Sequence, residues 1–594
     1  MDEGTKPPQS AGGRIGKYRK TIPALKGSDL FFLLFFSVVA GLGSGSGAIL
    51  FRWLLDASNR FFFQGAGTVL RLFGPAHVIL LPALGGAVVG PLIHFFSRES
   101  KGTGVPEIML SVATFRSVIP PRVVFMKILV SAICIGSGGS AGREGPIVQS
   151  GSAVGSYLGA RFRLSEERRK ILLACGAAGG VAATFNAPLG GIFFALEIIL
   201  GEYGPRYFSA VVLSSMTATE LSRYFLGDNP AFRIPAYRLG SPWQLPLYLL
   251  LGGLAALAAT LFVRSIYRCE DLFDGLRIPP YAKPALGGLA VGLIGFAVPG
   301  TFGVGYEQIE RLFDGRTAAD AAFVLLFAKM AATSATLGSG GSGGIFAPCL
   351  FLGAMFGSLF GHAMTVLLPG PGIAAGAGAL VGMGALFAGA AHAPITSILL
   401  VYEMTGDYQI LLPLMIACVT ATFVAGRLQP DSIYTLKLLR RGIDIVAIRG
   451  LNLLETLPVS ESMTTPVVTV GENASLSAVE DLMNRTGRGG LPVLDKNGRL
   501  SGMVARADIG ETAARGKGEI FVREAMRRDV VTCFADEHLG DAMQKMGEND
   551  IGQLPVVERS DPSRPVGMIT RRSVIDAYGE VSRKRKEARN RGID

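Results

Sequence analysis

The first 450 residues of this 594-residue sequence carry very little charge. They hold 60 of the 103 Lys, Arg, Asp and Glu residues, a charged fraction of 13%, whereas residues 451–594 hold the other 43, a fraction of 30%. A charged fraction of 13% is too low to cover the water-exposed surface of a body of that size. This scarcity excludes a single soluble enzyme and a disordered protein. It predicts that the first part lies in lipid and the second in water.

Cysteine and histidine are scarce as well. The six cysteines are scattered over the chain without a Cys-x-x-Cys pair, and the five histidines form no cluster. A secreted disulfide scaffold is therefore excluded, and we predict no metal site. We expect the cysteines to be small apolar residues within apolar helices.

Long apolar runs take the place of charge in the first part. Residues 29–55 can span a bilayer, because about 20 apolar residues are enough. Other runs, such as 122–135, 188–200 and 394–404, are too short to cross alone, and many runs begin or end in Gly or Pro. This pattern is typical of helices broken within the membrane, where exposed backbone must be buried in protein or line a cavity. We therefore predict an all-α integral membrane domain.

Basic residues gather at both ends of the chain. They are Lys6, Arg14, Lys17, Arg19, Lys20 and Lys26 before the first apolar run, and Arg583, Lys584, Arg585, Lys586, Arg589 and Arg591 in the tail. Flanking positive charge is typical of the cytoplasmic side of a membrane protein. We expect both termini in the cytoplasm, at a plasma (inner) membrane, and no nucleic-acid partner. A tail that binds nucleic acid is the alternative interpretation of the +11 net charge.

Internal repetition is the most informative feature of the first part. Residues 136–146 (GSGGSAGREGP) and 338–348 (GSGGSGGIFAP) agree at seven of eleven positions. Two further pairs follow the same order: Asn186-Ala187-Pro188 with Glu197 against His392-Ala393-Pro394 with Glu403, and Gly102-Thr103-Gly104 against Gly303-Val304-Gly305. These blocks predict two homologous halves, about 29–226 and 242–443. Such halves are commonly inverted about a pseudo-two-fold axis, with the site at their junction; a parallel repeat is the alternative.

Each glycine-rich segment leads into a proline, Pro146 or Pro348, which suits the first turn of a helix. That turn has free N–H groups and the positive end of the helix dipole. Two helix starts that face each other can therefore hold a small anion. Close helix packing is the alternative explanation for the glycines.

Glu144 lies within the first glycine-rich segment. A carboxylate inside a membrane is costly, and its presence indicates a function. At a helix start its oxygen can occupy the place of the anion until protonation or a competing anion displaces it. We predict that Glu144 is a gate, with an ion pair to Arg143 as the alternative; adjacent helical residues do not face each other, which weakens that alternative.

Three motifs in this order resemble the CLC family of chloride channels and proton-coupled chloride antiporters: GTGVPE at 102–107, GREGP at 142–146 and GIFAP at 344–348. The resemblance implies a homodimer with one anion path in each subunit, in which Glu144 is the gating glutamate. It also implies that Thr103, Gly145, Ile345, Phe346 and Tyr434 bind chloride. Within this set the backbone N–H groups of Ile345 and Phe346 hold the central anion, and the Tyr434 hydroxyl reaches it. For Tyr434 alone, an anchor at the membrane interface is the alternative.

Two positions depart from the family pattern. The usual serine of the first motif is Thr103 here, which retains the hydroxyl donor. The antiporters carry a proton-accepting glutamate as the second member of a Glu-Glu pair after the Asn-Ala-Pro motif, and this pair falls on Glu197-Ile198. Isoleucine cannot bind a proton. Glu197, one residue away, is the alternative proton carrier, although it points about 100° away around a helix. Its repeat mate Glu403 suggests a structural role for Glu197.

Past Leu457 the pattern changes to short strands and helices that recur once, marked by Leu491-Pro492-Val493-Leu494 and Leu554-Pro555-Val556-Val557. This tandem α+β unit resembles a pair of cytoplasmic CBS domains, which implies a possible adenine nucleotide ligand. The first repeat retains the ribose-binding Asp508 and lacks the hydroxyl, whereas the second retains the hydroxyl of Thr570 and lacks the Asp. Dimerisation without a nucleotide is the alternative role.

In chain order, the predicted domains are a basic cytoplasmic arm at 1–28, a membrane domain at 29–443, a linker at 444–460, CBS domains at 461–515 and 516–578, and a basic tail at 579–594. We predict passive chloride permeation gated by Glu144, with no enzymatic activity and no cofactor required. Proton-coupled chloride exchange by another proton route is the alternative. A sensor that works through its CBS pair is a more remote one.

Overall fold

The computed structural model describes residues 29–113, 119–228, 231–232, 234, 237, 241–368, 373–445, 457–513, 520–549, 551–577 and 579–580. The predicted arm at 1–28, most of the predicted linker and nearly all of the predicted tail lie outside the described residues. The chain divides into two compact units between Lys437 and Leu438. Each unit is described by itself.

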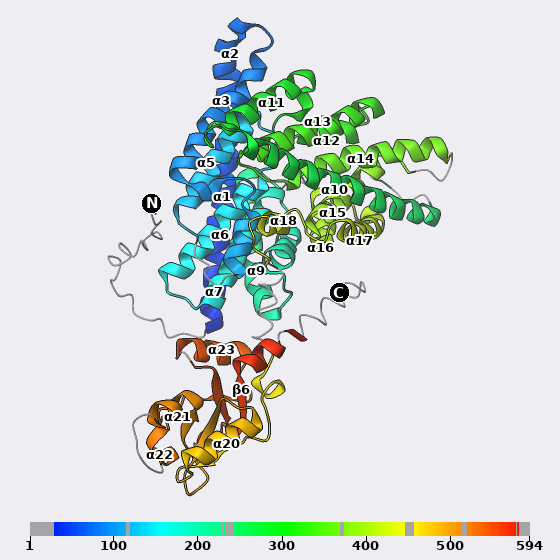
Figure 1. Ribbon diagram of the computed structural model, residues 1–594. Helices are drawn as coiled ribbons and strands as arrows, with labels where there is room; N and C mark the ends of the chain where they lie inside the picture. Colours follow the sequence, from blue (N-terminus) through cyan, green and yellow to red (C-terminus); the bar gives the residue numbers. More distant parts are fainter. Residues whose placement is uncertain are drawn as a thin grey trace. The chain divides into compact units, whose positions relative to one another are not determined.

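The first unit consists of helices and the loops that join them, drawn from blue to yellow-green in Figure 1. Its first half contains α1 (Asp29–Asn59), α2 (Gly67–Leu70), α3 (His77–Pro91), α4 (Val105–Ala113), α5 (Arg122–Gly136), α6 (Glu144–Arg161), α7 (Glu166–Phe185), α8 (Pro188–Phe193), the π-helix η5 (Phe194–Leu200) and α9 (Pro205–Leu226). Its second half contains α10 (Leu245–Gly275), α11 (Lys283–Ala297), α12 (Tyr306–Phe313), α13 (Ala319–Gly338), α14 (Phe346–Leu367), α15 (Ala375–Ala391), α16 (Pro394–Thr405), α17 (Leu411–Leu428) and α18 (Thr435–Leu439).

Six helical stretches among the described residues are long and apolar enough to cross a membrane: 33–70, 77–96, 242–275, 319–338, 346–367 and 408–428. Three shorter apolar helices accompany them at 188–200, 283–297 and 375–391. The mixture of full-length and short apolar helices confirms the prediction of an all-α membrane domain with interrupted helices.

Helices α3 and α11 pack directly against each other and show how the two halves are related (Figure 1). A Cβ added to Gly86 would overlap the carbonyl oxygen of Pro284, and one added to Gly288 would overlap that of Pro82. Further along, Gly90 faces Tyr281 and Gly292 faces Ile79 in the same way. Residue numbers therefore rise along α3 while they fall along α11, so the two helices are antiparallel.

This helix pair contains a fourth pair of matching segments between the two halves, which the sequence analysis missed. Pro82-Ala-Leu-Gly-Gly86 and Pro284-Ala-Leu-Gly-Gly288 are identical and are 202 residues apart, the offset of the glycine-rich segments. Equivalent helices of the two halves that lie antiparallel across a shared contact are related by a two-fold axis perpendicular to them. The inverted repeat is thus confirmed, and the parallel alternative is excluded.

The second unit holds two three-stranded sheets of the same topology. The strands are β1 (Val470–Gly471), β2 (Gly490–Leu494) and β3 (Leu500–Ala505) in one sheet, and β4 (Cys533–Phe534), β5 (Gln553–Val557) and β6 (Pro565–Thr570) in the other. In each sheet the first pairing is parallel and the second antiparallel. The helices are α20 (Leu476–Thr486), α21 (Arg506–Ala513), α22 (Val522–Ala525) and α23 (Leu539–Glu548). The first strand is short, since of residues 466–470 only Val470 enters β1.

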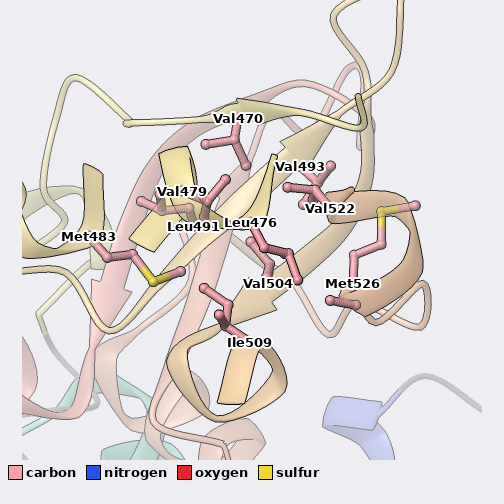
Figure 2. Close-up of a cluster of buried hydrophobic side chains, with 11 residues drawn as sticks. Val470, Leu476, Val479, Met483, Leu491, Val493, Val504, Ile509, Val522 and Met526 are labelled. Carbon is pink, nitrogen blue, oxygen red and sulfur yellow. The ribbon is translucent and has the colours of Figure 1, made fainter. Parts of the chain in front are cut away.

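The two cores of this unit exchange segments. The first core combines residues of β1 to β3 and α20 with Val522 and Met526, which come from beyond the first sheet (Figure 2). The second core combines β4 to β6 and α23 with Val459 and Met463, which precede the first sheet. Because each core borrows a segment from the other sequence repeat, neither repeat completes its core from consecutive residues alone.

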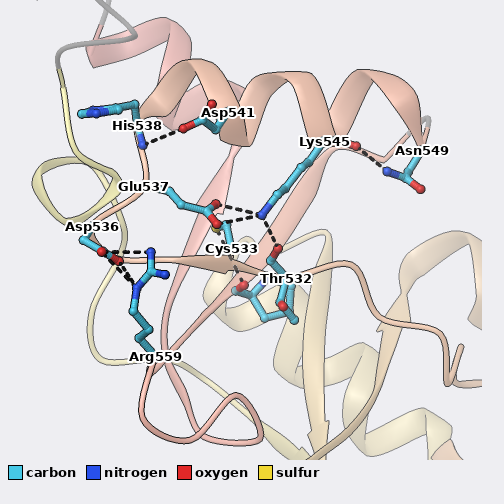
Figure 3. A network of polar contacts seen from close by, with 10 residues as sticks. Thr532, Cys533, Asp536, Glu537, His538, Asp541, Lys545, Asn549 and Arg559 are labelled. Carbon is cyan, nitrogen blue, oxygen red and sulfur yellow. Dashed lines mark hydrogen bonds and ion pairs between the residues drawn. The ribbon is translucent and has the colours of Figure 1, made fainter. Parts of the chain in front are cut away.

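A polar network ties α23 to the residues on either side of β4 (Figure 3). Lys545 Nζ donates to Glu537 at 2.8 Å and to the carbonyl oxygen of Thr532 at 3.0 Å. The Arg559 guanidinium, 2.9 Å from Asp536, holds the pKa of that carboxyl below its usual value. Burial raises the pKa of the Cys533 thiol to about 12, so it remains neutral at physiological pH, as expected for a cysteine used as a small apolar residue.

Candidate functional site

The two glycine-rich segments meet in the interior of the membrane unit. Gly142 and Gly344 exchange both backbone hydrogen bonds, with the Gly142 N–H donating at 2.8 Å and the Gly344 N–H at 2.6 Å. This contact brings the starts of α6 and α14 together, one from each half. The free N–H groups at a helix start and its positive dipole end favour an anion at this place.

The Glu144 carboxylate occupies the start of α14. Glu144 is the first residue of α6 and only 3% of it is exposed. Its Oε1 accepts a hydrogen bond of 2.6 Å from the backbone N–H of Phe346, the first residue of α14. Its Oε2 is buried and has no hydrogen-bond partner within the described part of the chain. The carboxylate is therefore held at one oxygen, in a position that an anion could take.

Arg143 turns away from Glu144. Its Nη2 donates to the carbonyl oxygen of Thr184 at 3.3 Å, and its guanidinium lies 5.0 Å from the ring centroid of Tyr306. These contacts give Arg143 partners of its own on α7 and α12.

The other predicted chloride ligands lie on three segments. Ile345 and Phe346 are buried at the start of α14, and the Phe346 ring packs between Phe185 and Phe387 at centroid distances of 4.8 and 4.5 Å. The Thr103 carbonyl is so close to Gly145 that a Cβ on that glycine would overlap it. Thr103 and Gly145 are thus neighbours at the start of α6.

Tyr434 is fully buried just before α18. The adjacent Ile433 is fixed twice: its N–H donates to Ala390 at 2.8 Å, and its carbonyl accepts from the Tyr267 hydroxyl at 2.6 Å. Within the described residues no hydrogen bond joins the side chains of Tyr434 or Thr103 to Glu144.

Glu197 and Glu403 cap each other's helices across the repeat. The Glu197 carboxylate accepts from the N–H of Thr396 at 2.7 Å and from its hydroxyl at 2.5 Å, at the start of α16. The Glu403 carboxylate accepts from the N–H groups of Leu189 and Gly190 at 3.0 and 2.7 Å, at the start of α8. Ile198 lies next to Glu197 in η5 and is buried. The carboxylate of Glu197 is thus engaged by α16.

In the second unit the two residues predicted to bind a nucleotide, Asp508 and Thr570, differ in their surroundings. Asp508 accepts from the N–H of Ala505 and from Arg527 Nε, both at 2.9 Å, and its side chain is 9% exposed. The Thr570 hydroxyl lies 2.8 Å from the hydroxyl of Ser573, the residue that replaces the aspartate. The residue predicted to bind ribose in the first repeat is therefore already in an ion pair. No group of residues suited to a metal ion occurs among the residues that the structure describes.

Inverted halves that join two helix starts around a buried carboxylate define a membrane protein for small anions. Residues 85–426 match the family model described as voltage gated chloride channel, and residues 459–511 and 522–580 match the CBS domain. The chain belongs to the CLC family of chloride channels and transporters and carries a CBS pair. Chloride transport across a membrane is its function.

Relatives of both functional kinds are similar to this chain. It is 36% identical to the H(+)/Cl(-) exchange transporter ClcA of Vibrio parahaemolyticus over 422 residues, covering 69% of this chain and 90% of that protein. It is 30% identical to the chloride channel protein CLC-f of Arabidopsis thaliana over 561 residues, covering 82% of this chain and 71% of that protein.

Solved structures share its fold. A slow cyanobacterial Cl⁻/H⁺ antiporter is 27% identical with a TM-score of 0.63, covering 69% of this chain and 97% of that one. A eukaryotic CLC transporter is 21% identical with a TM-score of 0.60, covering 92% of this chain and 98% of that one.

Two buried residues near the site were missed by sequence reasoning. Lys127 on α5 and Lys329 on α13 are fully buried and donate to loop carbonyls beside the glycine-rich segments. The sequence does indicate these two lysines, because both lie within apolar runs and they are 202 residues apart, which is the offset of the repeat.

Proposed function

We propose that the protein is a chloride channel gated by Glu144. The observation that carries this proposal is the Glu144 carboxylate at the start of α14, 2.6 Å from the Phe346 nitrogen. Chloride and the carboxylate compete for the same N–H donors. Protonation of Glu144 or a rise in chloride concentration therefore releases the carboxylate and opens the path.

Chloride passes between the starts of α6 and α14 in this proposal. The backbone N–H groups of Gly145, Ile345 and Phe346 and the hydroxyls of Thr103 and Tyr434 serve as its donors. Such donors suit a small, weakly hydrated anion and need neither a metal nor another cofactor.

Passive permeation is favoured by the absence of a proton carrier at Ile198. Isoleucine has no titratable group, and the neighbouring Glu197 already receives hydrogen bonds from α16. A carboxylate held by several donors resists movement, whereas Glu144 is held through one oxygen.

Proton-coupled chloride exchange is the second candidate, favoured by the 36% identity to an exchange transporter of Vibrio parahaemolyticus. It needs an internal proton route that avoids position 198.

Flux from liposomes reconstituted with the full-length protein distinguishes these functions. A chloride gradient should drive chloride flux without uphill proton movement. Proton pumping driven by chloride, which a protonophore collapses, would overturn the channel and support the exchanger. Absence of chloride flux at every pH, with or without ATP, would overturn both transport functions and favour the CBS-based sensor.

We further propose a homodimer in the plasma (inner) membrane, with both termini in the cytoplasm and the domain limits predicted above. Large apolar side chains are exposed on two repeat-related helices, Phe208 and Met216 on α9 and Leu412, Val419 and Phe423 on α17. In a membrane these side chains contact either lipid or a second copy of the chain, and the family resemblance implies the second copy. A monomeric mass in detergent would overturn the dimer.

An adenine nucleotide is the proposed ligand of the CBS pair, with Asp508 and Thr570 as its contacts. Flux that responds to ATP in the same liposomes would support this ligand. A flux unchanged by ATP, together with no ATP binding by calorimetry, would assign the pair to dimerisation instead.

A further inference from the structure

Two buried lysines clamp equivalent glycine loops in the two halves of the membrane unit. Lys127 Nζ donates to the carbonyl oxygens of Ser100 at 2.9 Å and Gly102 at 2.6 Å. Lys329 Nζ donates to the carbonyl oxygens of Thr301 at 3.0 Å and Gly303 at 2.7 Å. The same arrangement is thus built twice, once in each repeat.

An ammonium group without exposure to water is costly unless hydrogen bonds compensate for the lost hydration. Both lysines give charge-assisted bonds to backbone carbonyls, which are stronger than neutral ones. Bonds of this kind leave the charge in place and fix the path of the loop that supplies the oxygens. The clamps therefore determine where each loop lies.

The two clamped loops differ at their central residue, and Lys329 has a further contact, with its Nζ 5.2 Å from the centroid of the Phe351 ring. The loop held by Lys127 is Gly102-Thr103-Gly104, whose central residue has a hydroxyl donor, whereas the loop held by Lys329 is Gly303-Val304-Gly305, whose central residue has none. If the lysines only stabilised the fold, the two clamps would be equivalent. A role in anion binding would belong to Lys127 alone.

The loop held by Lys127 also contacts the opposite half and the start of α6. Its Gly102 N–H donates to Gly341 at 3.1 Å, and its Gly102 carbonyl accepts from Gly343 at 3.3 Å as well as from Lys127. The next carbonyl, that of Thr103, abuts Gly145. Loss of the clamp would thus remove one of the three hydrogen bonds that fix Gly102, and would loosen the adjacent Thr103 beside the helix start.

We propose that Lys127 is a positioning residue for the anion site, acting through Gly102 to hold the Thr103 hydroxyl at the start of α6, and that Lys329 is its structural counterpart without this effect. The inference rests on the proposed chloride path through Thr103.

The repeat supplies a matched control for the test. Chloride binding to the purified full-length protein is measured by calorimetry for Lys127→Met and Lys329→Met, with thermal unfolding recorded for both. We expect Lys127→Met to weaken chloride binding about 10-fold or more and Lys329→Met to weaken it less than about 3-fold at a similar loss of stability. Equal weakening by the two variants would overturn the inference. A wild-type protein that binds no chloride would instead refute the proposed function.

A double-mutant cycle tests whether Lys127 acts through Thr103. Thr103→Ala should weaken chloride binding, and adding Lys127→Met to it should weaken binding by less than about 2-fold further. Full additivity of the two losses would show that Lys127 acts by another route and would overturn the inference. If a methionine variant does not fold, Lys127→Gln and Lys329→Gln retain an N–H donor, and the same order of effects is expected.

Discussion

Glu144→Gln should abolish the pH dependence of chloride flux and leave the path open at neutral pH. The glutamine is neutral and does not compete with chloride for the Phe346 N–H as a carboxylate does. Losing a charge-assisted hydrogen bond of about 1.5–3 kcal/mol should raise flux at neutral pH about 10- to 100-fold. Wild-type flux should rise toward this level as the pH falls, because protonation removes the same charge.

The measurement is chloride efflux from liposomes across a pH series. Glu307→Gln is the control, since Glu307 is exposed on α12 and pairs with Arg311, and its pH profile should match the wild type. A Glu144→Gln profile that retains the wild-type slope would count against Glu144 as the gate.

Removal of the carboxylates that join the repeats should destabilise the membrane unit strongly. Glu403→Ala leaves the N–H groups of Leu189 and Gly190 without acceptors at the start of α8, and Glu197→Ala does the same for Thr396 at the start of α16. We expect the free energy of unfolding to fall by about 2–4 kcal/mol for each variant, because the helix cap is lost and the N–H donors are left without acceptors. Thermal unfolding in detergent measures it, with Glu307→Ala as the control.

The same pair separates structural from transport roles. Glu197→Gln should retain the wild-type shape of the pH profile even where it lowers stability, because its carboxylate does not lie in the proposed chloride path. A flattened profile would contradict the purely structural role and would restore Glu197 as a candidate proton carrier.

The two-half architecture of the membrane unit could be predicted from the sequence, because the repeat consists of Gly and Pro residues that few other residues can replace. Gly142 and Gly344 must allow two backbones to meet, and Pro146 and Pro348 begin helices. The antiparallel relation of the halves could not be predicted from these motifs. A sequence repeat shows which segments of the two halves are equivalent, but not how the halves are oriented relative to each other. It required the contact of Gly86 with Pro284.

Other features depend on partners that are remote in the chain. Glu197 and Glu403 were recognised as repeat mates with a structural role, but their reciprocal capping joins residues 199 to 214 positions apart. The exchange of segments between the CBS cores is equally long-range, since Met463 packs with strands that begin at Cys533. The departure from the family pattern at Ile198, by contrast, could be recognised from the sequence alone, because it is the absence of a titratable side chain and does not depend on the fold.

The two-fold relation of α3 and α11 has a consequence for direction. A backbone arrangement that recurs in both orientations gives the proposed chloride path little rectification of its own. Any difference between inward and outward chloride movement is expected where the two repeats differ, either in local backbone, as the π-helix η5 differs from α16, or in side chains. Glu144 is matched by Phe346, and Thr103 by Val304. The polarity of the proposed chloride path is thus expected to depend on such differences, and exchanging these side chains one pair at a time would measure the contribution of each pair.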